Sequence, residues 1–311
     1  MPVAADNKRL NGKGYRNAFK NGRRVSLLIV GCGYVGREVA RAWMTAGKTV
    51  AALTRGGKDR IAELAQLGIE PIEADWLDGD SHWTLPAARQ VLVSVPHRPD
   101  DRFGERTHCV GLANLVNRMP QVERLVVLST TGVYQQTDGQ SVDELAETRP
   151  TRIGPQIALA AEQWLAANVS PERSTVLRLA GIYGPGRVPL ISKLRAKEAI
   201  PVSQGELNLI HIDDITQTIV KLLTRPAPRY LYVLSDGQPV ERRAFYEAAA
   251  RIFKTPPPEF AQPQPGSSRA ERGESHKRID PERILHDLAL TLKYPNYIAG
   301  LTAIAELEPA F

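Results

Sequence analysis

The sequence lacks most features of secreted and membrane proteins. Among its 311 residues only Cys32 and Cys109 are cysteines, too few for a disulfide framework. No apolar run approaches the roughly 20 residues that a membrane-spanning helix requires. The N-terminus has no apolar stretch of the kind found in a secretory signal. These absences argue against a disulfide-rich secreted domain and an integral membrane protein, and we expect a cytoplasmic protein.

The main part of the chain also lacks an excess of charge. The pI is about 9.3 and the formal net charge is +6, but residues 1–24 hold seven basic residues and one acidic residue, which accounts for the whole excess. A nucleic-acid-binding domain usually carries its positive charge on the folded body. We therefore predict a disordered basic tail at 1–24, and we expect no nucleic-acid partner and no membrane partner.

What the sequence does contain is an alternation of short apolar runs with amphipathic segments. The runs have the length of strands, and most are rich in β-branched residues, as in parallel strands buried on both faces. They lie at residues 25–30, 49–53, 69–72, 90–95, 124–128 and 174–179. Segments with a helical period separate them, such as the one that contains Val35, Val39 and Trp43. The alternation predicts an α/β fold with a Rossmann-type doubly wound parallel sheet over residues 25–180.

The pattern changes after about residue 180, where glycine and proline interrupt the chain. Asp280 and Pro281 are typical of a helix start, with Asp280 as the N-cap and Pro281 as the first helical residue. Further helices are predicted near residues 190–197, 214–223 and 240–253, and the proline-rich stretch 255–266 is predicted to be a loop. We predict that residues 181–311 form mostly a small C-terminal substrate lobe, interleaved with the last elements of the sheet.

A glycine-rich loop follows the first predicted strand directly. Its sequence is Gly31-Cys-Gly-Tyr-Val-Gly36, and a predicted helix follows it. In this context Gly31 permits a tight turn, Gly33 lets the backbone approach a pyrophosphate, and Gly36 lets the helix pack closely on the strand. The helix N-terminus then offers N–H groups and a positive dipole end to the phosphates. The loop predicts a bound nicotinamide dinucleotide, and the intervening residues Cys32, Tyr34 and Val35 are assigned to the same site.

The residues after the second predicted strand favour NADP over NAD. An NAD site usually has an acid about 20 residues past the glycine loop, where it accepts a hydrogen bond from the ribose 2′-OH. Here the strand ends in Thr54-Arg55, and the nearest acid, Asp59, falls inside the next predicted helix. The planar guanidinium of Arg55 suits a 2′-phosphate. NADP is therefore the expected cofactor, with NAD as the alternative.

Two further strand ends are expected to contact the dinucleotide. Asp75 and Trp76 follow the third strand, where a carboxylate can accept a hydrogen bond from the adenine amine. Ser94, Val95 and Pro96 follow the fourth strand, where the chain would pass the ribose and the pyrophosphate. The alternative for Asp75 is a turn cap, a common role for an aspartate after a strand. No metal site is predicted.

Four motifs together resemble the extended and atypical short-chain dehydrogenase/reductases, the nucleotide-sugar epimerase/dehydratase superfamily. They are the glycine loop, Leu128-Ser-Thr-Thr-Gly-Val-Tyr134, Arg178-Leu-Ala-Gly-Ile-Tyr-Gly-Pro-Gly186 and Ile210-His-Ile-Asp-Asp-Ile215. The closing Lys277-Arg278 and Leu292-Lys-Tyr-Pro-Asn-Tyr297 resemble a bacterial subgroup known as NAD-dependent epimerase/dehydratase family proteins. The likeness covers nearly the whole chain after residue 25. It is specific for the superfamily but not for a substrate.

The resemblance implies a set of catalytic residues that this sequence keeps only in part. In the superfamily a Ser or Thr after the fifth strand hydrogen-bonds the reacting oxygen, and Thr130 occupies that position, with Ser129 beside it assigned to the cofactor. A Tyr then acts as general acid/base, together with a Lys four residues later. When the sequence is aligned on Glu162, these two positions fall on Gly154 and Ala158. Neither residue can transfer a proton, so the Tyr–Lys pair is predicted to be absent.

Three other side chains are candidates for the proton donor, and each has a structural alternative. Tyr134 and Tyr183 follow strands at the carboxyl side of the sheet, where ligands of α/β proteins bind; alternatively, they pack under the small lobe. His211 could titrate near neutrality; alternatively, it helps to position the lobe, while Asp213 or Asp214 caps the following helix.

Two functions are compatible with these observations. The first is an NADP-linked oxidoreductase or epimerase-like enzyme without the Tyr–Lys pair, in which Thr130 polarises a carbonyl or hydroxyl. Its substrate would be a small, nucleotide-sugar-like molecule between the sheet and the lobe, and Arg178 either contacts this substrate or forms an internal ion pair. The alternative is a non-catalytic dinucleotide-binding protein, either a redox sensor or a regulatory subunit. A homodimer is compatible with both.

Overall fold

The computed structural model describes residues 24–79, 84–98, 103–225, 229–266 and 276–307. The basic tail predicted at 1–24 lies outside these residues except for Arg24. This residue forms an isolated parallel β-bridge with Ala87, close to the start of the first strand.

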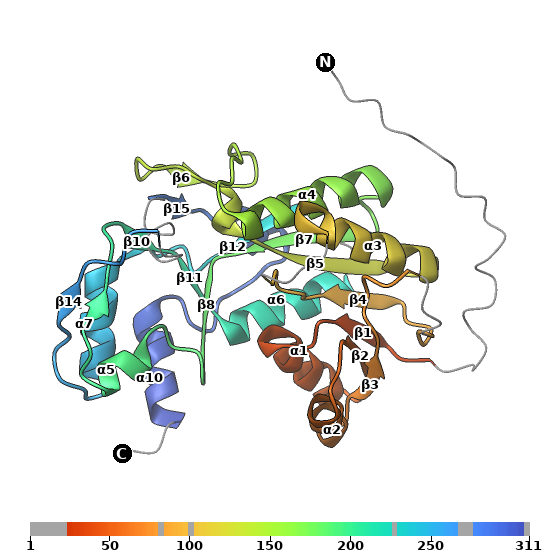
Figure 1. Cartoon of the computed structure of the whole chain (residues 1–311), viewed down its shortest axis with the longest axis horizontal. Coiled ribbons are helices and arrows are strands. Elements are labelled where there is room, and N and C mark those ends of the chain that lie inside the picture. The colour runs from red at the N-terminus through yellow and green to blue at the C-terminus, as the bar shows by residue number, and fades with distance from the viewer. Residues whose placement is uncertain (1–23, 80–83, 99–102, 226–228, 267–275, 308–311) are drawn as a thin grey trace.

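A seven-stranded parallel sheet forms the centre of the fold (Figure 1). Its order is β12-β7-β5-β4-β1-β2-β3, where β1 is Leu27–Val30, β2 Val50–Thr54, β3 Glu70–Glu73, β4 Gln90–Val93, β5 Arg124–Thr130, β7 Ser174–Leu179 and β12 Leu231–Leu234. The chain runs outward from β1 to β3 and then returns to β4, on the other side of β1. This confirms the predicted Rossmann-type doubly wound sheet. Ligands of such sheets bind outside the carboxyl ends of the strands, at this switch point.

Helices cover both faces of the sheet, and alternate strand residues pack against them. One face carries α1 (Tyr34–Thr45), α2 (Lys58–Gln66) and α6 (Ile212–Thr224), and the other carries α3 (Thr107–Arg118) and α4 (Ile153–Asn168) (Figure 1). Leu27 and Ile29 of β1 join the hydrophobic cluster on the first face, whereas Leu28 and Val30 join that on the second. All four are fully buried. Burial on both faces explains why these strands are continuous apolar runs.

The chain that leaves the carboxyl end of β7 builds much of a smaller lobe with its own core (Figure 1). Tyr183, Phe245 and Leu301 are fully buried in the hydrophobic cluster of this lobe. Its helices are α5 (Ile191–Arg195), α7 (Arg242–Ile252) and α10 (Tyr297–Leu307). Short strands pair as β8 (Gly181–Tyr183) with β11 (Leu209–His211), β9 (Ile200–Pro201) with β14 (Phe260–Ala261), and β10 (Glu206–Leu207) with β13 (Val240–Glu241). A further pair joins β6 (Ser141–Val142) to β15 (Arg278–Ile279).

Several elements of the C-terminal part differ from the sequence prediction. The edge strand β12 was not predicted. The predicted helix at 240–253 begins as strand β13, and the predicted loop at 255–266 contains β14. The helix predicted at Asp280 is α9 (Glu282–Asp287); Pro281 is its N-cap, and Asp280 Oδ1 accepts a hydrogen bond from the Glu282 N–H at 2.9 Å. Asp280 therefore accepts a hydrogen bond from the first turn of α9, but it does so from the residue before the N-cap rather than from the N-cap itself.

Candidate functional site

The glycine loop between β1 and α1 has the geometry of a dinucleotide-binding loop. Gly31 adopts φ = +82°, and a Cβ there would lie 2.7 Å from the Ser94 carbonyl oxygen, so both conformation and space exclude a side chain. A Cβ on Gly36 would lie 3.1 Å from the Gly31 carbonyl oxygen, which explains how α1 can pack so closely on β1. A Cβ on Gly33 would meet no heavy atom within 4 Å. Gly33 thus faces open space, where a ligand can approach the backbone.

The N-terminus of α1 begins at this same open space. Gly33 is the N-cap, and no side chain caps the helix, so the first N–H groups and the positive end of the dipole are available to a phosphate. The Cys32 side chain is buried, which raises its thiol pKa to about 11, and Val35 packs in the core. Both can contribute only main chain to a ligand site. Tyr34 lies at the rim, where its hydroxyl donates to the Pro185 carbonyl at 3.0 Å and links the loop to the lobe.

The segment after β4 lies against the glycine loop. The Ser94 N–H donates to the Val30 carbonyl at 2.8 Å, and Val95 Cγ2 lies 2.9 Å from the position of a Cβ on Gly31. Pro96 is exposed next to them. Ser94, Val95 and Pro96 are therefore placed beside the loop, and their contact with a dinucleotide stays a prediction.

Charges of both signs lie near the end of β2. Arg55 is exposed directly after this strand. The carboxylate of Glu73, at the end of β3, packs against Gly56, and its Oε1 lies 3.5 Å from the Gly57 nitrogen. Sequence reasoning did not consider Glu73, because only the pairing of β2 with β3 brings the two strand ends together. An acid is thus present near the expected position, although it comes from the neighbouring strand.

Asp75 and Trp76 follow β3 but belong to the local structure. Asp75 Oδ1 accepts a hydrogen bond from the Leu77 N–H at 3.0 Å, which is the turn-cap alternative. The Trp76 ring is buried; it packs on Gly111 of α3 and lies edge-on to His108, with ring centroids 5.6 Å apart. The Trp76 side chain is therefore part of the core, and a contact of this strand end with the cofactor stays a prediction.

A buried ion pair lies beneath the end of β5. Arg178 and Glu162 form a bidentate pair with Nη2 2.6 Å from Oε2, and both side chains are almost fully buried. The Ser129 hydroxyl donates to the same carboxylate. Arg178 Nη1 also donates to the Tyr134 hydroxyl at 2.7 Å. Arg178 therefore forms the internal ion pair rather than a substrate contact, and the Ser129 side chain is occupied in this network rather than directed at a cofactor.

Thr130 follows Ser129 and ends the strand. Its Oγ1 accepts a hydrogen bond from the Gly132 N–H at 3.0 Å, at the N-cap of the 3₁₀ turn η2 (Thr131–Val133). Because Oγ1 serves as acceptor in this bond, its own proton remains available to a substrate oxygen. Thr130 is partly buried at the carboxyl end of the sheet, as expected for the residue that orients the reacting oxygen.

The two candidate tyrosines are packing residues in this structure. The Tyr134 hydroxyl donates to the Asp143 carbonyl at 2.6 Å, and burial raises the pKa of Tyr134 to about 12. Tyr183 is fully buried against Gly300 of α10, and burial raises its pKa as well. Both hydroxyls lie away from solvent, which favours the structural alternative for each.

His211 is also a structural residue. It is 2% exposed, and its ring packs between Tyr183 and Tyr294, with centroid distances of 5.1 and 4.0 Å. Its Nδ1 accepts a hydrogen bond from the Asp213 N–H at 3.2 Å, so His211 itself is the N-cap of α6. This corrects the prediction that Asp213 or Asp214 caps the helix. Asp214 instead accepts from the N–H groups of the Leu292-Lys-Tyr-Pro-Asn-Tyr297 motif, at 2.6 and 3.0 Å.

We expect His211 to make the protein sensitive to mild acid. Burial lowers its pKa from the ordinary 6.5 to about 4, so between these values the unfolded chain binds a proton that the folded protein does not. The free energy of unfolding then falls as pH decreases from 6.5 to about 4, by on the order of 3 kcal/mol. In His211→Asn, which keeps a capping acceptor without a titrating group, urea unfolding should show a flatter pH profile. An unchanged slope would rule out His211 as the cause.

The first two turns of α4 hold no Tyr–Lys pair. Gly154 and Ala158 stand where the resemblance places the Tyr and the Lys, and residues 153–168 include neither residue type. A Cβ on Gly154 would lie 3.4 Å from Cδ2 of His97, which comes from the segment after β4. Sequence reasoning missed His97, although its position just after a strand end is the usual signal of a site residue.

A group of cations lies close to the start of α4. Lys277 is buried, and its Nζ donates to the Tyr134 carbonyl at 2.7 Å. Burial, together with the nearby positive charges of Arg152 and Arg242, lowers the pKa of Lys277 to about 8. Arg152 precedes α4, and its Nη2 lies 3.1 Å from the position of a Cβ on Gly132. The cations therefore reach the neighbourhood of Thr130, and they favour an anionic ligand there.

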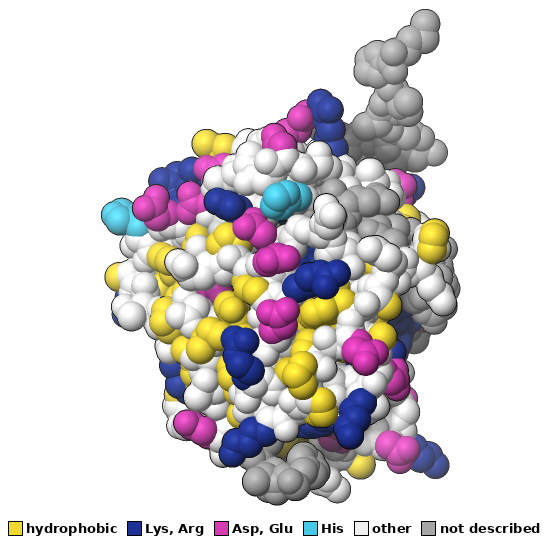
Figure 2. Space-filling view, turned by 90° about the vertical axis from the view of Figure 1, so that its left-hand side faces the viewer, with side chains coloured by type: hydrophobic (Ala, Val, Ile, Leu, Met, Phe, Trp, Pro, Cys, Tyr) yellow, Lys and Arg dark blue, Asp and Glu magenta, His cyan; other side chains and the backbone are white. Residues whose placement is uncertain are grey.

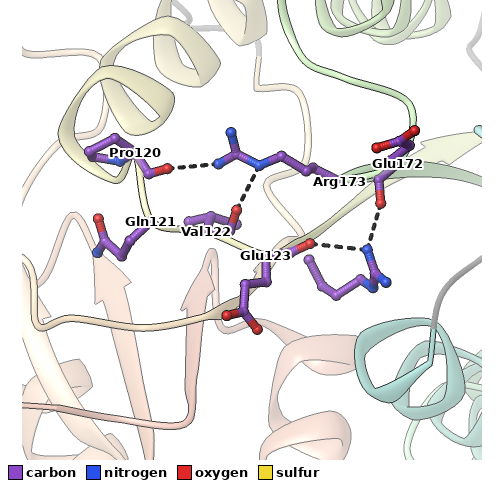
Figure 3. Close-up of a pocket in the computed structure, with 7 residues that line it drawn as sticks. Pro120, Gln121, Val122, Glu123, Glu172 and Arg173 are labelled. Carbon is purple, nitrogen blue, oxygen red and sulfur yellow. Dashed lines mark hydrogen bonds between the residues drawn. The ribbon is translucent and has the colours of Figure 1, made fainter.

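A surface pocket near the amino ends of β5 and β7 is unrelated to this site (Figure 3). The residues that line it are Pro120, Gln121, Val122, Glu123, Arg124, Glu172 and Arg173. Arg173 donates to the carbonyls of Val122 and Pro120 at 2.8 and 2.9 Å, and Arg124 donates to that of Glu172 at 2.5 Å. These arginines join loops at the end of the sheet opposite to the glycine loop, so the pocket carries no part of the dinucleotide site.

Three simple kinds of site are absent: a patch of one charge from the face shown in Figure 2, and a metal cluster and a membrane-spanning helix from the described residues. On the face of the molecule shown in Figure 2, acidic and basic side chains are intermingled rather than gathered by sign. Within the described ranges, no three His, Cys, Asp or Glu side chains are grouped so that they could hold a metal ion. In the same ranges, none of the helices combines the length and the hydropathy needed to cross a bilayer.

Known proteins resemble this chain over most of its length, both in sequence and in structure. A curated relative, Protein YeeZ of Escherichia coli K12, is 27% identical over 277 residues, which cover 86% of this chain and 96% of YeeZ. A solved structure of a functionally unknown conserved protein from Silicibacter pomeroyi is 29% identical with a TM-score of 0.76, and covers 91% of this chain and 98% of that one. The UDP-glucose 4-epimerase of Thermotoga maritima, solved with UDP-glucose, has a TM-score of 0.76 at 16% identity, over 90% of this chain and 97% of that one.

The family model for the NAD dependent epimerase/dehydratase family matches residues 27–233. This span runs from β1 through β12 and includes the glycine loop, Thr130 and α4. The family model matches about two thirds of the chain. The two solved structures named above share the fold of this chain. The chain therefore belongs to the NAD-dependent epimerase/dehydratase family.

Proposed function

We propose that this chain is an NADP-linked oxidoreductase or epimerase-like enzyme that acts on a small, nucleotide-sugar-like substrate without the Tyr–Lys pair. The observation that carries the proposal is the open glycine loop at Gly33, placed at the same edge of the sheet as Thr130. Residues 25–180 would bind the dinucleotide, and residues 181–311 would supply most of the substrate lobe.

The residues around the loop fit a dinucleotide. The backbone at Gly33 and the first N–H groups of α1 would hold the pyrophosphate, Ser94 and Val95 would border it, and Arg55 would bind a 2′-phosphate. When bound, the nicotinamide ring supplies hydride chemistry. The protein's part is to orient the substrate and to handle its proton.

The cations near Thr130 support an anionic substrate. The positive charges of Arg152 and Arg242 lie near enough to Lys277 to lower its pKa. A substrate diphosphate close to these three side chains would be attracted by each of them. The Thermotoga maritima epimerase, which shares the fold, was solved with UDP-glucose. We therefore infer a phosphate-bearing substrate of this general class.

We expect Arg55→Ala to remove most of a preference for NADPH over NADH. A charge-assisted hydrogen bond contributes about 1.5–3 kcal/mol, which corresponds to roughly a 10- to 100-fold loss in NADPH affinity. NADH affinity should hardly change. The matched variant Glu73→Gln, which removes the negative charge beside Gly56, should strengthen NADPH binding. Equal affinity of the wild type for both cofactors in fluorescence titrations would contradict the NADP assignment.

Thr130→Val tests the catalytic proposal directly. Loss of a hydrogen bond to the reacting oxygen, worth about 1–3 kcal/mol, should lower turnover roughly 10- to 100-fold, whereas Thr130→Ser should retain most of it. The substrate for this assay is the small molecule that co-purifies with the protein, identified by mass spectrometry. NADPH affinity should remain unchanged in both variants. Turnover that survives Thr130→Val would place the active site elsewhere.

The absence of Tyr and Lys from α4 favours a second candidate function. A dinucleotide-binding protein without a proton donor could act as a redox sensor or as the regulatory subunit of a partner. If the protein turns over no substrate, and NADPH changes its binding to another protein, this second function replaces the first.

A further inference from the structure

The position of the missing tyrosine is not an empty part of the structure. A Cβ on Gly154 would lie 3.4 Å from Cδ2 of His97 and 3.8 Å from its Cβ and Cγ. The imidazole therefore lies where a side chain at 154 would begin. A single methyl group would be in ordinary contact with the ring, but a tyrosine would compete with it for the same space.

His97 reaches Gly154 from the segment after β4, which also lies against the glycine loop. Ser94 packs its carbonyl against Gly31, and His97 follows three residues later. Three residues span at most about 10 Å. His97 therefore lies between the glycine loop and the first turn of α4, and its side chain is partly buried rather than enclosed.

Thr130 borders the same turn of α4. A Cβ on Gly132 would lie 3.1 Å from Thr130 Oγ1 and 3.0 Å from Cγ of Pro155, the residue that follows Gly154. The Thr130 hydroxyl and Pro155 thus both lie next to Gly132, and the imidazole of His97 lies next to Gly154, so the two side chains approach the same turn of α4. The other three candidates, Tyr134, Tyr183 and His211, are almost fully buried and hydrogen-bonded to main chain.

We propose that His97 is the general acid/base of this protein and takes the place of the missing tyrosine. This rests on the proposed function. When a substrate hydroxyl is oxidised, its O–H bond breaks and an imidazole nitrogen of His97 takes the proton. A bound oxidised nicotinamide ring would accept the carbon-bound hydrogen as hydride while the carbonyl forms. In the reverse direction the same nitrogen returns the proton to the oxygen. Imidazole is the side chain most often used for such transfers.

The first test needs no substrate. Diethyl pyrocarbonate is reacted with the full-length protein with and without saturating NADPH, and modified histidines are mapped by mass spectrometry. We expect NADPH to protect His97, because this residue lies beside the proposed dinucleotide site. His286, whose side chain is 89% exposed on α9, is the internal control and should react equally in both samples. Equal modification of His97 in both samples, with NADPH shown to bind, would overturn the placement of His97.

The second test compares His97→Gln with His286→Gln, using the substrate identified above. General acid/base assistance typically contributes about 10²- to 10⁴-fold in rate, so we expect a loss of that size for His97→Gln and none for His286→Gln. NADPH affinity and melting temperature should be unchanged in both. The triple variant His97→Gly, Gly154→Tyr, Ala158→Lys should regain part of the turnover by restoring the family's pair. Full turnover in His97→Gln would refute the role of His97 alone, whereas a wild type that binds no NADPH would refute the proposed function as well.

Discussion

Replacement of Gly33 with valine is expected to abolish dinucleotide binding and leave the fold intact. A Cβ at this position meets no protein atom within 4 Å, so the branched side chain does not disturb the packing. It fills the space through which the pyrophosphate must approach the backbone and the N-terminus of α1. Affinity for both NADPH and NADH should fall below detection in a fluorescence titration, while the melting temperature without ligand changes little.

Gly31→Ala is the matched contrast to this variant. The methyl group at Gly31 would lie 2.7 Å from the Ser94 carbonyl oxygen, on a backbone with φ = +82°. We therefore expect Gly31→Ala to lower the free energy of unfolding, whereas Gly33→Val should lower only affinity. Undiminished binding of both cofactors by Gly33→Val would show that the dinucleotide does not approach this loop.

The sheet could be predicted because its strands are buried on both faces. Continuous apolar runs such as those of β1 and β4 need no partner to be recognised. Six of the seven strands were predicted, although β3 is only partly buried and contains two glutamates. β12 is as long as β1 and is also apolar, but it joins β7 after more than 50 intervening residues, in the part of the chain that was predicted to form mostly the lobe. The two-residue strands β13 and β14 are defined by their pairing and have no sequence pattern of their own. Their formation depends on tertiary contacts rather than local preference.

The same distinction applies to the candidate site. The roles of the three loop glycines follow from local context, and their geometry agrees with the prediction. The approach of His97 to Gly154 and of Lys277 to Tyr134 joins segments that are far apart in the chain. His211 shows the converse case: its motif was recognised, but its burial depends on Tyr183 and Tyr294, which only the fold brings to it.

Glu162→Leu should destabilise the protein by about 3–5 kcal/mol, because it leaves the Arg178 guanidinium buried without its counter-charge. Both side chains are almost fully removed from water, and the pair is bidentate. The loss is a large part of the 5–15 kcal/mol that typically separates folded from unfolded states. Urea unfolding at neutral pH measures it. Tyr134→Phe removes only the hydroxyl that Arg178 contacts, and should cost less, about 1–3 kcal/mol.

The double variant Glu162→Leu, Arg178→Met separates the charge pair from the packing around it. With both charges removed no uncompensated ion remains buried, so the double variant should be more stable than either single variant. Ser129 loses its acceptor in both Glu162→Leu and the double variant, so this cost cancels when the stabilities of these two variants are compared.

Thr130 follows Ser129 directly, so the single variants should also displace the Thr130 hydroxyl. The double variant should then recover part of any turnover that the single variants lose. A loss of less than about 1 kcal/mol in the free energy of unfolding of Glu162→Leu would show that the ion pair does not hold the end of β5 in place. Thr130 would then be positioned by the hydrogen bond that it accepts from the Gly132 N–H.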